Sequence, residues 1–289
     1  MPTVIIAAHN EATGIERCLR SVFSDKVPGL VVTVVPNACR DETADRARGI
    51  AVPPEAKLLV FETEVAGKTN AFNLAERKLK DLGLDYFPRL FLDGDIELAA
   101  GSIRALLAAT DAPGPRIASA TPVFDTTGCS IVSRLLYVAA RFNPYHTEGA
   151  PNGSGTYCVN VEGRARWGEF PDVIADDAYV ERQFAPTQRE TVATASARVR
   201  VPRNMRAVRG VAARNRLGMA ELDAIGVPAV SVRSSSSTLR VMARRMLPNP
   251  GLWPAFVVFI ASRLIKRIDS RRVSKLPRQA RWQQDQSTR

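Results

Sequence analysis

The sequence has few of the side chains that form metal clusters or disulfides. Among its 289 residues are four cysteines, which share no C-x-x-C spacing, and two histidines, His9 and His146. This pattern argues against a structural zinc site and a disulfide framework, and it is typical of a reducing compartment. The first residues also lack the basic and apolar regions of a secretory signal. We therefore expect a cytoplasmic protein.

The sequence also lacks an apolar stretch long enough to predict a membrane crossing. The uncharged residues 247–262 number only 16 and are interrupted by prolines, whereas a spanning helix needs about 20 apolar residues. Within them, residues 252–261 are strongly apolar, and lysines and arginines follow from Arg263 to Arg272. Two interpretations remain. The segment is either a helix packed on the body of the protein or a peripheral anchor that binds anionic lipid on the inner face of the cell membrane. Trp253 and the basic flank favour the anchor.

Most of the chain lacks excess positive charge, although the net charge is +11. Residues 201–289 hold 18 Lys and Arg against four Asp and Glu, whereas residues 1–200 hold 22 against 25. The basic surface therefore belongs to the last third, where it can face phosphates or anionic lipid.

Apolar, β-branched runs alternate with helical patterns in the first half. Strands are predicted at residues 3–8, 30–35, 58–61 and 90–92, and amphipathic helices follow the first three. This alternation predicts a doubly wound α/β fold with a mostly parallel sheet, whose ligands bind at the carboxyl ends of the strands. In the second half we predict strands at residues 117–123, 156–161 and 191–201 and a helix at 129–142.

Polar clusters follow all four of the first strands. Each cluster taken singly is typical of a helix cap or a turn, but together they place polar side chains on one rim of the sheet: His9-Asn10-Glu11, Asn37, Lys68-Thr69-Asn70 and Asp93-Gly94-Asp95. Asp93 and Asp95 project to the same side of an extended backbone, so both carboxylates can reach one divalent cation. The rim could thus bind a nucleotide diphosphate through Mn²⁺ or Mg²⁺.

Four segments in this order resemble the family 2 glycosyltransferases, which have the GT-A fold. They are Val4-Ile5-Ile6-Ala7-Ala8-His9-Asn10-Glu11, Val35-Pro36-Asn37-Ala38-Cys39-Arg40-Asp41-Glu42-Thr43, Gly67-Lys68-Thr69-Asn70-Ala71-Phe72-Asn73-Leu74-Ala75 and the D-x-D segment Asp93-Gly94-Asp95. The resemblance implies that Ala8, Glu11 and Asn37 lie around the nucleoside. It also implies that Lys68 lies near the donor, and Asp93 and Asp95 at the ribose and a metal-bridged diphosphate. Asn37 replaces a frequent acid, so nucleotide binding is better supported than the identity of the base.

Residues 167–179 contain the paired acids Asp176 and Asp177 at the start of an expected helix. Such acids can simply stabilise the helix, because their negative charge lies at its positive N-terminal end. The segment, however, resembles the family's E-D motif, which implies that Asp177 deprotonates the acceptor hydroxyl and that Asp176 stands in the glutamate's place. One base without a separate nucleophile implies inversion at the anomeric carbon.

Three further features suggest binding roles. Gly153-Ser154-Gly155 could let the backbone approach an acceptor sugar, or form an ordinary turn. His146 could be a base or a ligand, although a structural role is the commoner one. Arg206 and Arg209 share a helical face, and by resemblance this basic segment closes on the diphosphate. Processive members of the family carry a Q-x-x-R-W motif, which is absent from this sequence. Its absence favours the transfer of a single sugar.

We therefore expect a GT-A domain over residues 1–217, with a nucleotide-sugar-binding half (1–98) and an acceptor half (99–217). A basic helical extension follows at 218–289, with a linker at Ser234–Ser237 and a disordered end at 279–289. The expected substrates are a nucleotide-diphosphate sugar and a hydroxyl or lipid-linked saccharide acceptor. There are two alternative functions. One is a nucleotidyltransferase, but the glycine-rich phosphate loop that such an enzyme usually has after its first strand is missing from this sequence. The other is a catalytically inactive scaffold that binds polysaccharide or membrane. A nucleic-acid partner is not expected, because the motifs lie in the part without positive charge.

Overall fold

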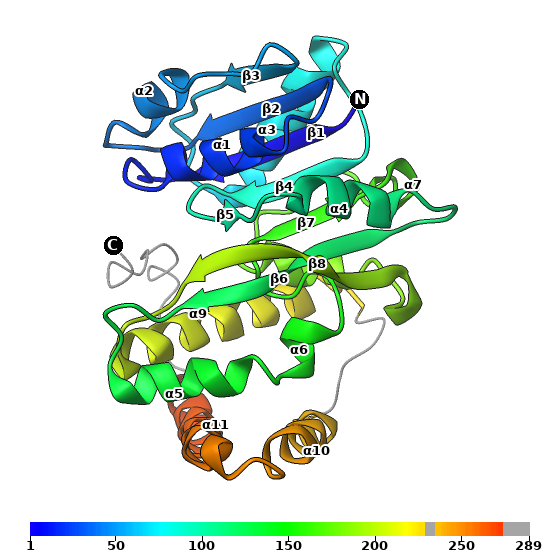
Figure 1. Ribbon diagram of the computed structural model, residues 1–289. Helices are drawn as coiled ribbons and strands as arrows, with labels where there is room; N and C mark the ends of the chain where they lie inside the picture. The colour runs from blue at the N-terminus through cyan, green and yellow to red at the C-terminus, as the bar shows by residue number, and fades with distance from the viewer. Residues whose placement is uncertain (229–234, 274–289) are drawn as a thin grey trace.

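A computed structural model describes residues 1–228 and 235–273 and shows one eight-stranded sheet with helices on both faces (Figure 1). The strands are β1 (Thr3–Ala8), β2 (Leu30–Pro36), β3 (Ala56–Val60), β4 (Arg89–Asp93), β5 (Glu97–Leu98), β6 (Ile117–Asp125), β7 (Thr156–Val159) and β8 (Arg189–Arg200). The helices of the first half are α1 (Ile15–Ser24), α2 (Thr43–Arg48), α3 (Lys68–Asp81) and α4 (Ser102–Thr110). Those of the second half are α5 (Ile131–Ala140), α6 (Pro144–Thr147), α7 (Val161–Arg164), α8 (Asp176–Glu181), α9 (Met205–Ala224), α10 (Ser235–Met246) and α11 (Trp253–Val273).

The strand order is β3-β2-β1-β4-β7-β6-β8-β5. The four strands β3, β2, β1 and β4 pair in parallel, as the alternating pattern predicts. Beyond them β7 runs antiparallel to both β4 and β6, and β5 runs antiparallel to β8, while β6 and β8 pair in parallel. The sheet is therefore mixed, and the predicted parallel arrangement is confirmed for its first half.

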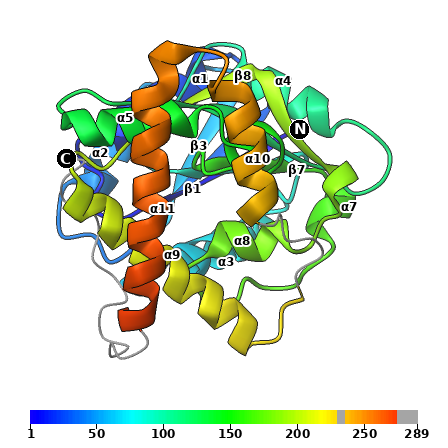
Figure 2. The same ribbon diagram turned by 90° about the horizontal axis from the view of Figure 1, so that it is seen from below.

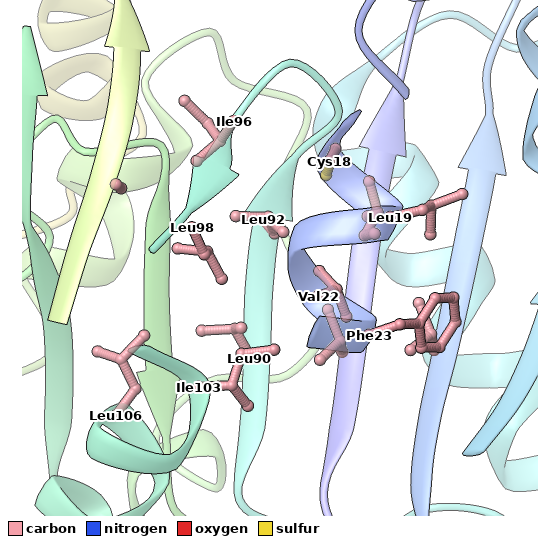
Figure 3. Packing of buried hydrophobic residues seen from close by; sticks show 14 of the residues in the cluster. Cys18, Leu19, Val22, Phe23, Leu90, Leu92, Ile96, Leu98, Ile103 and Leu106 are labelled. Carbon is pink, nitrogen blue, oxygen red and sulfur yellow. The ribbon is translucent and has the colours of Figure 1, made fainter. Parts of the chain in front are cut away.

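Strand β4 is buried on both faces because its side chains alternate between two cores. Leu90 and Leu92 point into a cluster that α1 and α4 cover, where Leu19, Val22 and Ile103 are fully buried (Figure 3). Phe91 points the other way. This alternation holds the carboxyl end of β4 in a fixed position between two helical layers.

The second core is aromatic and lies under α3. Phe91 stacks on Tyr157 of β7 with a ring separation of 5.0 Å and meets Phe72 of α3 edge to face at 4.9 Å. Phe170 packs against both phenylalanines at 5.5 Å. The chain that precedes α8 is thereby attached to the same core as α3 and β4.

The helices after β8 form a third layer beside β6 and β8 (Figures 1 and 2). Helix α11 packs on α5 and buries Ala255 and Phe259 against Leu136 and Val208. Its opposite face leaves Trp253, Val257 and Leu264 exposed. The structure thus shows a helix docked on the body, and contact with an anionic membrane stays a prediction. Within the described residues no helix has the length and apolarity that a membrane crossing requires.

Two expectations about the C-terminal region need adjustment. The predicted linker is wrong for residues 235–237, because α10 begins at Ser235 and its buried Met242 and Met246 join the core of α5 and α11. Ser234 and residues 279–289 lie outside the described residues. The expected domain boundary at residue 217 falls inside α9, which continues to Ala224.

The docking of α11 can be tested with two residues of opposite exposure. Phe259 is 7% exposed and Val257 is 64% exposed. We expect Phe259→Ala to lower the free energy of unfolding by about 3 kcal/mol, because it leaves a cavity, and Val257→Ala to change it by less than about 0.5 kcal/mol. Urea denaturation measures both values, and equal effects would show that α11 is not packed as described.

Candidate active site

A cavity of about 1250 Å³ lies at the carboxyl ends of β1 and β4. It brings together residues from segments that are far apart in the sequence. Its acidic and basic lining at this end comprises His9, Glu11, Lys68, Asp93, Asp95, Asp176 and Asp177. The predicted rim of polar side chains therefore exists, and the acids expected in the second half of the chain share it.

The ammonium group of Lys68 joins the two halves of this rim. Its Nζ lies 2.7 Å from Asp93 Oδ1, 2.8 Å from Asp176 Oδ2 and 3.8 Å from Asp177 Oδ1. Burial alone would lower the pKa of Lys68, but the three carboxylates together raise it well above its usual value. Lys68 thus stays charged and compensates part of the negative charge in the cavity.

Asn37 positions Lys68 through the backbone. Its side chain is 1% exposed, donates from Nδ2 to the carbonyl of Ala8 at 2.8 Å and accepts from the amide of Gly67 at 3.2 Å. The carbonyl end of β1 and the start of α3 are therefore tied to β2. The side-chain amide of Asn37, which was expected to contact the nucleotide base, is thus hydrogen-bonded to backbone groups. Ala8, the other residue expected near the nucleoside, is buried beneath the rim and does not line the cavity.

Gly94 lets the turn after β4 lie against the end of β1. A Cβ at this position would come within 3.0 Å of the Ala8 Cβ and 3.3 Å of the Ala7 carbonyl oxygen. The turn carries Asp93 and Asp95, both of which line the cavity. Burial, and then the charge of Asp93, raise the pKa of Asp95 to about 6.

The neighbouring carboxylates of Asp93 and Asp95 fit a divalent cation. Their repulsion would be relieved by Mg²⁺ or Mn²⁺, which accept one or two carboxylates together with phosphate oxygens. In the part of the chain that the structure describes, no three His, Cys, Asp or Glu side chains are grouped to hold a metal by themselves.

Asp176 and Asp177 open helix α8. Asp176 is buried against Lys68, while the side chain of Asp177 keeps 29% of its surface exposed toward the cavity. Burial raises the pKa of Asp177 to about 7; the charge of Lys68 opposes this rise, and the charges of Asp176 and Asp93 add to it. A carboxylate with this pKa is suited to accept a proton near neutral pH.

The loop at residues 153–155 contributes glycines but no side chain to the cavity. Gly153 and Gly155 line it, whereas Ser154 is buried and its Oγ donates to the Thr156 carbonyl at 3.2 Å. Gly155 has φ +68°, and a Cβ there would lie 2.6 Å from Ile96 Cγ1. Ser154 is thus wrongly placed for the predicted contact with an acceptor, because its hydroxyl closes the turn.

His146 lines the cavity in a fixed orientation. Its Nδ1 lies 2.7 Å from the Asn152 carbonyl oxygen, which can only accept, so Nδ1 carries the proton. Burial lowers the pKa of His146, so the imidazole is neutral near pH 7. The aromatic ring of Tyr145, which also lines the cavity, packs against it edge to face at 4.8 Å.

The arginines that line the cavity are not the predicted ones. Arg206 and Arg209 are exposed and do not line the cavity, because α9 turns the face with Val208, Val211 and Ala212 toward it. Arg200 and Arg214 line the cavity instead, and the charge of Arg200 lowers the pKa of Asp95. Sequence reasoning missed both. Arg200 could have been found from its position at the end of a predicted strand.

A family model adds the decisive comparison. The model described as "Glycosyl transferase family 2" matches residues 3–152, which include Lys68, Asp93 and Asp95. The chain belongs to glycosyl transferase family 2. The matched range ends before Asp177, so the model says nothing of the paired acids at the start of α8. No curated protein shows a significant match.

Solved structures of S. aureus TarS are similar to this chain in fold. S. aureus TarS residues 1–349 in complex with UDP aligns with a TM-score of 0.50 and 15% identity over 84% of this chain and 70% of that chain. TarS 1–349 in complex with UDP-GlcNAc aligns with a TM-score of 0.48 and 15% identity over the same shares of the two chains. The α/β architecture with a mixed central sheet and flanking helices is that of the GT-A glycosyltransferases.

The raised pKa of Asp177 predicts a pH-dependent cost to stability. Between about pH 4 and pH 7 the folded chain binds a proton at Asp177 that the unfolded chain has lost, so stability falls as the pH rises through this range. We expect Asp177→Asn to be more stable than the parent by about 1–3 kcal/mol at pH 8 and equal to it near pH 3. Denaturation at both pH values measures the difference. Asp111→Asn, at an exposed position, is the matched control, and the same gain in that variant would contradict the assignment.

Proposed function

We propose that this protein is a metal-dependent, inverting glycosyltransferase that moves one sugar from a nucleotide-diphosphate sugar to an acceptor hydroxyl. One observation carries the proposal. Asp177, with a pKa raised to about 7, shares a cavity with Asp93 and Asp95 in a chain of glycosyl transferase family 2. A proton acceptor and a carboxylate pair for a cation are the two groups that this transfer needs.

The donor is proposed to lie along the ends of β1 and β4. Glu11 and His9 line this part of the cavity beside Asp93, and Arg200 lines it as well. TarS is bound to UDP in the structure that aligns with a TM-score of 0.50, which makes uridine nucleotides the first donors to test. Mn²⁺ or Mg²⁺ held by Asp95 and Asp93 would offset the negative charge of the departing diphosphate. Lys68 and Arg200 add fixed positive charge to this region.

Asp177 is proposed to be the catalytic base, and Asp176 to hold Lys68 beside it. The acceptor O–H bond breaks as its proton passes to Asp177, and the oxygen forms a new bond to the anomeric carbon. The bond from that carbon to the diphosphate breaks, and the diphosphate leaves with the electron pair. Because the acceptor attacks the face opposite the leaving group, the anomeric configuration inverts.

Donor binding tests the role assigned to Asp95. Isothermal titration with a panel of nucleoside diphosphates and their sugars should find one base that binds in the presence of Mn²⁺. We expect Asp95→Ala to weaken this binding at least tenfold, because one of the two carboxylates for the cation is lost. Asp111→Ala, remote from the cavity, should bind like the parent. Equal affinity with and without Mn²⁺ would contradict metal dependence.

The pKa of Asp177 sets the expected pH profile. The rate of nucleotide diphosphate release from the donor should rise with pH and level off above about pH 7, because only the ionised carboxylate accepts a proton. We expect Asp177→Asn to lower kcat by about 10²–10⁴-fold and to leave the Kd of the nucleotide within about twofold. Nuclear magnetic resonance of the product reports its anomeric configuration. Retention, or full activity in the variant, would refute this role.

A further inference from the structure

The cavity extends well beyond the carboxylates. Its volume of about 1250 Å³ exceeds the range of about 300–1,000 Å³ that is usual for a pocket holding one small ligand. One end holds Lys68, Asp95 and Asp177, while the lining at the other end comes from strand β6 and the helices α5, α9 and α11. A single continuous space therefore connects the proposed reaction centre with the C-terminal helices.

The far end is largely apolar, and we call it the apolar lobe. It is lined by Phe124, Leu136, Tyr137, Ala140, Val208, Val211, Ala212 and Phe259. Figures 1 and 2 show the helices that supply these side chains packed together on the β6 and β8 side of the sheet. Such a surface offers a nucleotide or a sugar few hydrogen bonds, whereas it gains free energy when it covers hydrocarbon.

We propose that the apolar lobe receives the hydrocarbon chain of a lipid-linked acceptor. This inference rests on the proposed function, because it takes the acceptor hydroxyl to lie at Asp177. An acceptor with its hydroxyl at that position extends either out of the cavity or along it toward α11. The second path places the part of the acceptor beyond the sugar against Val211, Ala212 and Phe259.

Positive charge beside the lobe suits an anionic link between sugar and lipid. Arg214 and Arg263 line the same cavity, and the guanidinium of Arg263 lies 5.5 Å from the ring centre of Phe259. Glu221, an acid on this side, accepts a hydrogen bond from the Ile174 amide at 3.0 Å and so holds the loop before α8. A phosphate that follows the sugar would meet the arginines before the chain enters the lobe.

The proposal separates the two substrates by chemistry. The polar donor is bound by groups on β1, α3 and β4, and the apolar part of the acceptor by groups on α5, α9 and α11. A tryptophan placed in the lobe should therefore block a hydrocarbon chain and leave nucleotide binding unchanged. Val211 and Ala212 line the cavity from α9, whereas Ala220 on the same helix is exposed and does not.

The test uses dodecyl phosphate and butyl phosphate as probes, below their critical micelle concentrations, with isothermal titration against the full chain. We expect dodecyl phosphate to bind at least tenfold more tightly than butyl phosphate, because the longer chain buries more methylene groups. Ala212→Trp and Val211→Trp should each weaken dodecyl phosphate binding at least tenfold. Ala220→Trp, the matched control, should bind it like the parent.

Nucleotide binding in the same samples separates this proposal from the proposed function. Unchanged Mn²⁺-dependent nucleotide binding in both lobe variants shows that they are folded and that the donor site is intact. If the parent binds nucleotide but shows no preference for the longer chain, the lipid-linked acceptor is overturned and the glycosyltransferase proposal stands. Equal dodecyl phosphate affinity in Ala212→Trp, Val211→Trp and the parent also overturns it. If no nucleotide binds to the parent, the proposed function itself fails.

Discussion

The site depends on one partly buried ammonium group that is shared among three carboxylates from two segments of the chain. Lys68 at the first residue of α3 contacts Asp93 at the end of β4 and both acids that open α8. Without this positive charge, the cavity would hold several uncompensated acids, and removing one partner of a buried ion pair commonly costs about 3–5 kcal/mol. The position of the ammonium group is in turn fixed by Asn37, which holds the backbone at Gly67. The aromatic core beneath α3 then keeps the helix and β4 in register.

This arrangement lowers the stability of the fold and gives Asp177 a pKa that suits proton transfer near neutral pH. Burying Asp177 among other acids makes its ionised form unfavourable, as the pKa of about 7 shows, and the surrounding fold must supply that free energy. The contributions come from close-packed elements on both sides of the sheet, such as Leu92 in one core and Phe91 in the other. The rigid layers allow a strained set of charges to persist in a cavity that also admits water and substrates.

The sequence predicted the elements of the first half closely, because apolar β-branched runs and amphipathic helices have clear periodicities. The strand at residues 3–8, a helix after the third strand and the grouping of the four polar clusters are all confirmed. Side-chain direction could not be predicted in the same way. The buried bonds of Asn37 depend on how β1 and α3 meet, and the outward position of Arg206 depends on which face of α9 packs inward. A composition rich in serine concealed the helix at residues 235–246, whose buried methionines are its real signal.

Strand β7 has a consequence for the order of folding. It joins the two halves of the sheet, and its pairing of Thr156 with Leu92 closes a long loop of chain. Strands β1 to β4 can associate through short crossovers, whereas this pairing requires an ordering of distant segments that is slower to reach. We therefore expect Lys68 to meet Asp93 earlier in folding than Asp176. A nascent chain that has only its first half folded holds no complete charge cluster, so we expect the catalytic centre to arise in the final stage of folding.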